Sequence, residues 1–412
     1  MVEDDLYYYL GFSHCYGIGP MKLASLLKYF GCAEKAYKAT KQDLIKIIGQ
    51  NLGEKFVVFR NRFDPLKKLE ELRKKEIAVI PIYSPLYPKA LKEISDPPIC
   101  LYIKGDAELL TNSVTPFFQE SSISDQSSRF CHSRSLLSCE ALRSPSATQS
   151  ASRRDHLARD TYLLFFAIVG TRTPTPYGQQ IARKFASELA EAGFIIVSGM
   201  ALGIDSISHW AALDAGKKTV AVLGCGVDII YPAVNRRLYN EIIDKQGLVI
   251  SEFPPGQTVL KGLFIARNRI ISGLSKGILV IEGASDSGAL ITARYAANQG
   301  KDVFATPAPI TSPMSQAPNL LLKQGAKLVT SVEDIYEELG IKITPVKKDN
   351  IERLLSDRER HIFHLLQEEP MLVDDISIEI NLEVVEILNI ISILEIKGVI
   401  EKNEEGRYQA KI

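Results

Sequence analysis

Six short apolar runs alternate with helix-length amphipathic segments between residues 166 and 307, and this alternation constrains the fold more than any other feature. Near-continuous apolar runs are typical of strands buried on both faces. The runs are "FAIVG" (166–170), "FIIVSG" (194–199), "TVAVLG" (219–224), "GLVISE" (247–252), "GILVIEG" (277–283) and "DVFATP" (302–307). Strands that alternate with helices predict an α/β fold with a doubly wound parallel sheet. Ligands bind such sheets beyond the carboxyl ends of the strands, so functional residues are expected directly after these runs.

The segments that follow the predicted strands are rich in glycine, serine and arginine. Glycine lets backbone amides approach an anion, a helix N-terminus attracts negative charge, and arginine makes bidentate contacts with phosphate. Several such segments along one sheet edge favour an extended polyanion over a single nucleotide. The candidate anion-binding residues are Gly170 and Arg172 after the first run, Ser198, Gly199 and Gly203 after the second, Arg236 and Arg237 after the third, Arg267 and Arg269 after the fourth, and Ser287 and Gly288 after the fifth.

Structural roles compete with several of these assignments. A glycine after a strand can be a simple turn, and Arg267 and Arg269 could be structural ion-pair residues. His209 follows Asp205 by four residues and is better explained as a packed side chain than as a catalytic base. The "GCG" at 224–226 lacks the third glycine of a dinucleotide-binding fingerprint. Because no Ser-His-Asp set, metal-ligand cluster or P-loop lysine emerges, we expect a binding protein with no catalytic residue, metal or cofactor.

Composition narrows the class of protein further. The 412 residues include 49 basic and 49 acidic side chains, so any nucleic-acid site must be a local patch. No window approaches 18 consecutive apolar residues, and the acidic N-terminus lacks the basic region of a signal peptide. The six cysteines include no C-x-x-C pair and fit reduced thiols. These features indicate a cytoplasmic protein without a membrane span.

Shifts in composition divide the chain into segments. Residues 113–166 contain 13 serines, six arginines and no lysine, which predicts a disordered insertion; a functional regulatory loop is the alternative. The predicted order is a helical domain of the helix-hairpin-helix or SAM-like kind at 1–75, a lead-in to the sheet at 76–112, the insertion at 113–166, the sheet domain at 167–340, a linker at 341–350 and a winged-helix-like domain at 351–412. The first domain carries "GIGP" (17–20), which is either a phosphate-facing hairpin or a plain turn.

The last of these domains has an unusual charge. Residues 351–412 carry 14 acidic and seven basic side chains. The third predicted helix, "LEVVEILNIISILEIKG" (382–398), is apolar and acidic at the place where a DNA reader would need lysine or arginine. Because phosphate contacts dominate DNA affinity, this helix is expected to contact protein rather than DNA.

Taken in order, six stretches of the sheet domain resemble the motifs of the DNA-processing protein A (DprA/Smf) family. They are "AIVGTR", "SGMALGIDSISHWAAL", "TVAVLGCGVDIIYPAVNRRL", "SEFPPG", "ARNRIISGLS" and "SGALITARYAANQGKDVFATP". The resemblance covers nearly all of residues 167–330 and implies an extended Rossmann-like domain that binds single-stranded DNA without known catalysis. It further implies a homodimer that loads a RecA-type recombinase during natural transformation, with single-strand-binding protein as a further partner. Arg172 is the best single candidate for a DNA contact.

Two other classes of function stay open at the level of sequence. Nucleotide-cleaving phosphoribohydrolases have a similar fold, with Glu282 as a possible acid, although "EGASDSGALIT" stands where their P-G-G-x-G-T signature would be. The chain could also be an inactive adaptor copy disrupted by the insertion. Departures from the family pattern support that alternative, at Ala233, Phe264-Ile265, Ala308 and Ala317-Pro318.

Overall fold

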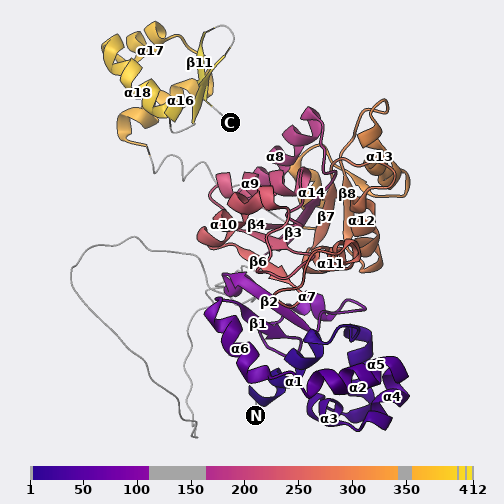
Figure 1. The fold of residues 1–412 in the computed structure, drawn as a ribbon. Coiled ribbons are helices and arrows are strands. Elements are labelled where there is room, and N and C mark those ends of the chain that lie inside the picture. The colour runs from indigo at the N-terminus through magenta and orange to yellow at the C-terminus, as the bar shows by residue number, and fades with distance from the viewer. Residues whose placement is uncertain (1–2, 111–163, 342–354, 397–398, 404–405, 411–412) are drawn as a thin grey trace, which may run out of the picture. The chain divides into compact units, whose positions relative to one another are not determined.

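The computed structural model describes residues 3–110, 164–341, 355–396, 399–403 and 406–410 (Figure 1). These residues form two compact units, one within 1–339 and the other within 340–412. The predicted insertion and linker lie outside the described residues, with two exceptions at their ends. Ile341 is described, and the first strand of the parallel sheet begins at Leu164, so residues 164–166 belong to the sheet rather than to the insertion.

A nine-stranded sheet forms the centre of the first unit, and it confirms the doubly wound α/β prediction. All six apolar runs contain strands: β3 (Leu164–Val169), β4 (Phe194–Ser198), β5 (Thr219–Val222), β6 (Leu248–Ser251), β7 (Gly277–Val280) and β8 (Asp302–Ala305). The short β9 (Lys327–Leu328) extends one edge, and β1 (Ala78–Pro81) and β2 (Cys100–Gly105) extend the other. The strand order is β1-β2-β6-β5-β4-β3-β7-β8-β9. Strands β3 to β9 pair in parallel, whereas β1 and β2 are antiparallel to their neighbours.

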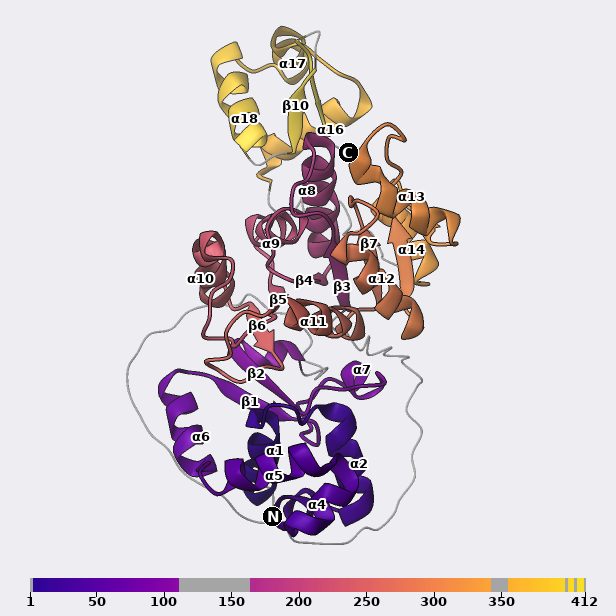
Figure 2. The same cartoon turned by 45° about the vertical axis from the view of Figure 1, so that its right-hand side comes forward.

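Helices cover both faces of this sheet (Figure 2). On one face lie α8 (Pro176–Glu191), α9 (Ile204–Asp214), α10 (Arg236–Asp244) and α14 (Val332–Glu338). On the other lie α7 (Lys89–Lys92), α11 (Lys261–Leu274), α12 (Gly288–Asn298) and α13 (Gln316–Lys323). Side chains of β3 alternate between the two faces, and Phe165, Ala167 and Val169 join the core beneath α11 and α12. Burial on both faces explains why these strands are mostly apolar, with Ser198, Thr219, Ser251 and Asp302 at strand ends.

The chain reaches the sheet through an N-terminal group of helices that shares its core. They are α1 (Glu3–His14), α2 (Pro20–Phe30), α3 (Ala33–Lys38), α4 (Lys41–Ile48), α5 (Gln50–Arg60) and α6 (Pro65–Lys74). Phe12 and Phe56 stack at the centre of this group, with 5.1 Å between ring centroids. One hydrophobic cluster runs from these helices to Tyr102 of β2 and Val249 of β6, so the helical part and the sheet form one compact unit.

The second unit has the order helix, helix, helix and β-wing, as predicted. Its elements are α16 (Asp357–Glu368), α17 (Val373–Ile380), α18 (Val384–Ile396), β10 (Ile400–Lys402) and β11 (Tyr408–Ala410). The two short strands pair in antiparallel fashion. Ile362, Phe363, Ile387 and Ile391 form the middle of a separate hydrophobic core, so this unit has its own source of stability.

Candidate nucleic-acid interface

A pocket of about 840 Å³ opens at the carboxyl end of β3. β3 lies between β4 and β7, where the direction of strand addition reverses, and this is the place where doubly wound sheets bind their ligands. The walls come from the segment after β3 and from the first turns of α11 and α12. The polar and aromatic lining residues include Thr171, Arg172, Tyr231, Lys261, Phe264, Asn268, Asp286 and Ser287.

The exposed cation Arg172 meets an aromatic pair at this pocket. Its guanidinium carbon lies 5.8 Å from the ring centroid of Phe264, within the range of a cation–π contact. The Phe264 ring is in turn 5.5 Å from that of Tyr231, which is 41% exposed. Within the described part of the chain, no carboxylate forms an ion pair with Arg172 or with the exposed Lys261 of the same pocket. Their positive charges are therefore available to an anion.

Glu282, which follows β7, holds the segment that carries Arg172. The Thr171 N–H donates to the backbone carbonyl of Glu282 at 2.7 Å. The Glu282 carboxylate accepts hydrogen bonds from the backbone N–H and the hydroxyl of Thr175, at 2.9 and 2.5 Å. Thr175 also caps α8 by accepting from the Gly178 N–H at 3.2 Å. Arg172 thus lies between Thr171 and Thr175, which are both tied to the buried Glu282 just after the neighbouring strand β7.

Two of the predicted phosphate-binding glycines serve close backbone packing. A Cβ at Gly170 would lie 2.6 Å from the Ile204 side chain. Gly203 has φ +76°, and a Cβ there would collide with the Thr171 carbonyl oxygen and lie 2.7 Å from the Arg172 carbonyl carbon. Any other residue at 203 would displace the segment that carries Arg172. Direct phosphate contact by these two glycines stays a prediction.

Buried hydrogen bonds occupy the polar groups at the end of β4. The Ser198 hydroxyl donates to the Ile168 carbonyl at 2.7 Å, and the Gly199 N–H donates to the Asp205 carboxylate at 3.2 Å. Ser198 and Gly199 are both buried. These groups already form hydrogen bonds with the sheet and with the start of α9, and direct phosphate contact by Ser198 and Gly199 stays a prediction.

Arg267 lies beneath the pocket rather than at its mouth. It is only 4% exposed, and its guanidinium donates to the carbonyls of Gly199, at 2.7 Å, and Val222. A Cβ at Gly199 would collide with this guanidinium. Burial lowers the pKa of Arg267 to about 10, which leaves it protonated at neutral pH. Arg267 can contribute positive potential to the floor of the pocket, but its guanidinium already donates hydrogen bonds to backbone carbonyls of the protein.

Arg269 forms buried ion pairs, the structural role that the sequence left open for it. Its side chain is 4% exposed, and its guanidinium donates twice to the Glu252 carboxylate at 2.7 Å and once to Asp96 at 2.8 Å. All three guanidinium nitrogens are therefore engaged. This buried ion-pair set favours the structural role, so we leave Arg269 out of the proposed interface.

The remaining candidates lie in two different places. Arg236 and Arg237 are exposed at the start of α10 but do not line the pocket, and the Arg237 guanidinium carbon lies 5.4 Å from the Trp210 ring centroid. Ser287 and Gly288 do line it. The Ser287 hydroxyl caps α12 by accepting from Ala289 N–H at 3.3 Å, so a helix N-terminus faces the pocket.

Sequence patterns did not single out the aromatic pair or Lys261. Tyr231 and Phe264 are 33 positions apart, and only the folded chain brings their rings together. Lys261 begins α11 and resembles any exposed lysine in the sequence. Asp286 was missed as well, and its carboxylate makes the mouth less uniformly positive.

His209 is a core residue. It is fully buried, and its Nδ1 lies 2.7 Å from the Thr219 hydroxyl, which donates to the Ile196 carbonyl. Burial lowers the pKa of His209 to about 3, so the ring is neutral at physiological pH. Within the described ranges, no group of three histidine, cysteine or acidic side chains is placed to hold a metal ion. No helix among the described residues is long and apolar enough to cross a membrane.

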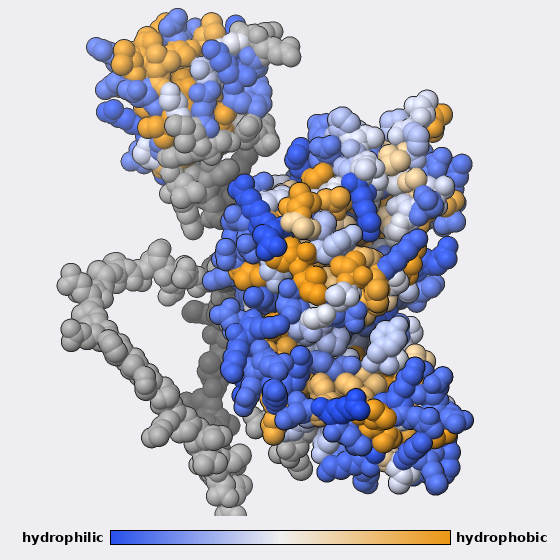
Figure 3. Space-filling model, viewed as in Figure 1, coloured by the Kyte–Doolittle hydropathy of each residue, from blue (hydrophilic) through white to orange (hydrophobic). Residues whose placement is uncertain are grey.

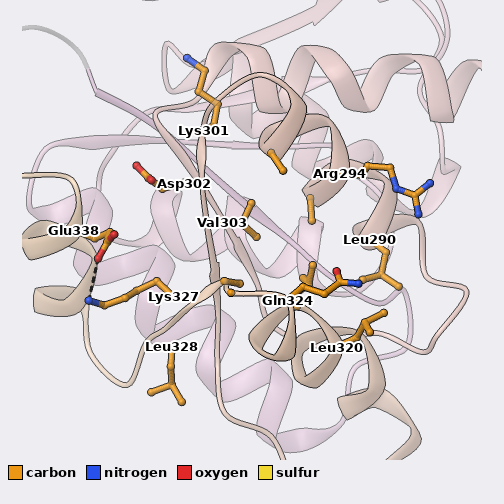
Figure 4. A pocket seen from close by; sticks show the side chains of 15 residues that line it. Leu290, Arg294, Lys301, Asp302, Val303, Leu320, Gln324, Lys327, Leu328 and Glu338 are labelled. Atoms are coloured by element: carbon orange, nitrogen blue, oxygen red, sulfur yellow. Dashed lines mark ion pairs between the residues drawn. The ribbon is translucent and has the colours of Figure 1, made fainter.

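A second pocket, of about 670 Å³, lies near the β9 edge of the sheet (Figure 4). It is lined by charges of both signs, among them Arg294, Lys301 and Asp302. Lys327 of β9 pairs with Glu338 at 2.9 Å. This pocket contains none of the residues predicted from the sequence to bind an anion.

Comparison with known proteins identifies the family. The model of the family described as DNA recombination-mediator protein A matches residues 158–340, and that of the DprA winged helix domain matches residues 347–406. Protein Smf of Synechocystis is 33% identical over 372 residues, covering 89% of this chain and 80% of the relative. DNA processing protein DprA of Bacillus subtilis is 37% identical over 271 residues, covering 66% and 74%. The X-ray structure of DprA from Streptococcus pneumoniae superposes with a TM-score of 0.60 at 31% identity, covering 80% of this chain and 96% of that one. The chain therefore belongs to the DprA/Smf family of DNA-processing proteins.

Proposed function

We propose that this protein binds single-stranded DNA across the pocket at the end of β3. The observation that carries the proposal is the group of Arg172, Phe264 and Tyr231, in which a cation without an ion-pair partner among the described residues lies beside two aromatic rings. Single-strand sites combine a positive groove for phosphates with aromatic platforms for bases. We assign phosphate contact to Arg172 and Lys261, and base stacking to Phe264 and Tyr231.

The biological role that we propose follows from family membership. Relatives of this chain bear the name DNA processing protein. We propose that this protein protects incoming single strands during natural transformation and passes them to a RecA-type recombinase, with single-strand-binding protein as a further partner. A RecA-type ATPase assay on DNA coated with single-strand-binding protein, with and without this chain, tests the transfer.

A binding role without catalysis agrees better with the site than nucleotide hydrolysis does. The Glu282 carboxylate, the candidate acid of a hydrolase, is 2% exposed and accepts both hydrogen bonds from Thr175. Through these hydrogen bonds Glu282 positions the segment that carries Arg172, which forms a wall of the pocket. Release of free base from nucleoside monophosphates by the purified protein would favour the enzyme instead.

Single-stranded DNA is expected to bind at least about tenfold more tightly than duplex of the same length, with little dependence on sequence. The physical reason is that stacking on Phe264 and Tyr231 requires unpaired bases. Fluorescence anisotropy with labelled single-stranded and duplex oligonucleotides measures both affinities. Equal affinities would contradict the stacking role, and no binding at low salt would favour the inactive adaptor.

We further propose that two copies of the chain form a homodimer through the β9 edge. β9 is the last strand of the sheet, so its outer backbone groups have no strand partner in the described chain. Leu328 of β9 and Leu320 of α13 are 48% and 40% exposed. The nearby pocket carries charges of both signs, which suits the self-complementary interface of a two-fold dimer.

Leu328→Glu is expected to weaken this dimer by about 100-fold or more, because it places two like charges at a desolvated two-fold contact. Sedimentation velocity over a range of concentrations measures the change. Leu86→Glu is the matched control, since Leu86 is also 48% exposed but lies away from β9. A dimer that is weakened only by the Leu86 change would place the interface elsewhere.

A further inference from the structure

The third helix of the C-terminal unit, α18, has one exposed apolar stripe. At 3.6 residues per turn, Val385, Leu388, Asn389, Ser392 and Ile393 fall within an arc of roughly 140°. Val385, Leu388 and Ile393 in this arc are 66%, 43% and 44% exposed. The opposite side of the helix carries Ile387 and Leu394, which are fully buried in the core of the unit. Packing of the unit itself therefore leaves this stripe uncovered, and Figure 3 shows hydrophobic side chains gathered on the visible face of the unit.

Acidic residues border the stripe on both sides. On a helical projection Glu386 lies at one margin and Glu395 at the other. Residues 373–396 contain six carboxylates and no lysine, arginine or histidine. Across the described residues, none of these six forms an ion pair. Three exposed apolar side chains, with Asn389 and Ser392 between them, therefore lie between acidic margins.

This charge pattern excludes two occupants of the stripe. The third helix of DNA-binding winged helices enters a groove between phosphates, and the margins of α18 would be repelled there. A second copy packed on the same stripe by a two-fold axis would bring Glu386 and Glu395 against acidic margins without an opposing base. Both occupants would bury like charges without compensation.

We propose that this stripe is a docking site for a basic amphipathic helix of a partner protein. Three apolar anchors on one helix face match the helix-in-groove mode of recognition, in which the partner presents apolar side chains at i, i+3 or i+4, and i+7. Lysine or arginine beside those anchors would neutralise Glu386 and Glu395. This role is independent of the DNA pocket, because the stripe belongs to the other compact unit.

Labelled peptides of about 18 residues test this proposal with the full chain. The first peptide carries leucine at helical spacing with lysine and arginine between, the second has the same leucines with glutamate, and the third is a scrambled basic sequence without an apolar face. Fluorescence anisotropy is expected to give at least about tenfold tighter binding of the first peptide than of the other two, and weaker binding at high salt.

Variants on the stripe sharpen the test. Leu388→Ser is expected to weaken binding of the first peptide about tenfold, as loss of a central anchor does. Glu386→Lys combined with Glu395→Lys should reverse the preference toward the acidic peptide. Ile310→Ser is the matched control, because Ile310 is an exposed apolar residue (92%) of the first unit. All four positions are exposed, and melting curves verify that each variant is folded.

Three results would overturn the proposal. The first is equal binding of the amphipathic and scrambled basic peptides, which would reduce the effect to charge alone. The second is unchanged peptide affinity in Leu388→Ser. The third is a concentration-dependent increase in mass that Leu388→Ser abolishes while the peptides fail to bind, because that would assign the stripe to a second copy.

Discussion

Arg172→Ala is expected to weaken single-stranded DNA binding about 10- to 100-fold while leaving the protein folded. A lost charge-assisted hydrogen bond costs about 1.5–3 kcal/mol, and Arg172 is exposed and makes no ion pair within the described chain. Loss of one phosphate contact also lowers the salt slope by about 0.7. Affinity measured by fluorescence anisotropy at several salt concentrations gives both quantities.

Two variants control this experiment. Arg172→Lys keeps the charge and loses the planar guanidinium that lies 5.8 Å from the Phe264 ring centroid, so it should retain part of the affinity. Arg183→Ala removes another exposed arginine of the same unit, on α8 and outside the pocket, and should change little. A folded Arg172→Ala protein with the affinity and salt slope of the original chain would remove the main support for this DNA site.

Arg269→Met is expected to lower the free energy of unfolding of the first unit by about 3–5 kcal/mol, the cost of breaking a buried ion pair. The change leaves the Glu252 carboxylate, which is 11% exposed, without its bidentate partner. It also cuts the tie between α11 and Asp96 in the lead-in to the sheet. Urea denaturation measures the loss, with the two units analysed as separate transitions.

A second substitution distinguishes ion-pair loss from simple mispacking. Burial raises the pKa of Glu252, so the carboxylate is costly when it stands alone. Adding Glu252→Gln to Arg269→Met should therefore recover part of the lost stability. If Arg269→Met were fully stable but poor at binding DNA, Arg269 would belong to the interface after all.

The sheet was predictable because a strand that is buried on both faces is a continuous apolar run in the sequence. Each of the six strands is a short and mostly apolar run, and the helices between them show a helical spacing of apolar residues. The pairing of β2 with β6 was not predictable in the same way. Tyr102 pairs with Ser251 across nearly 150 positions, and nothing in either segment specifies the other.

The site was predictable only in part, for a similar reason. Arg172 could be found because it directly follows a strand, and position along a strand is a local property. Arg267 and Arg269 look alike in the sequence. In the fold, however, Arg267 donates hydrogen bonds to backbone carbonyls, whereas Arg269 donates to carboxylates. Those partners come from β4, β6 and their neighbours, so no local pattern reveals them. The same is true of the contact between Tyr231 and Phe264.

The hydrogen bonds of Glu282 have a consequence for the entropy of binding. Its carbonyl and carboxylate tie Thr171 and Thr175, on either side of Arg172, to the end of β7. The protein wall of the pocket is therefore preorganised, and little of its conformational freedom remains to be lost when a ligand arrives. The ordering cost falls on the nucleic acid instead. Strands that are already extended would fit at a smaller entropic cost than strands that must first unstack or unfold.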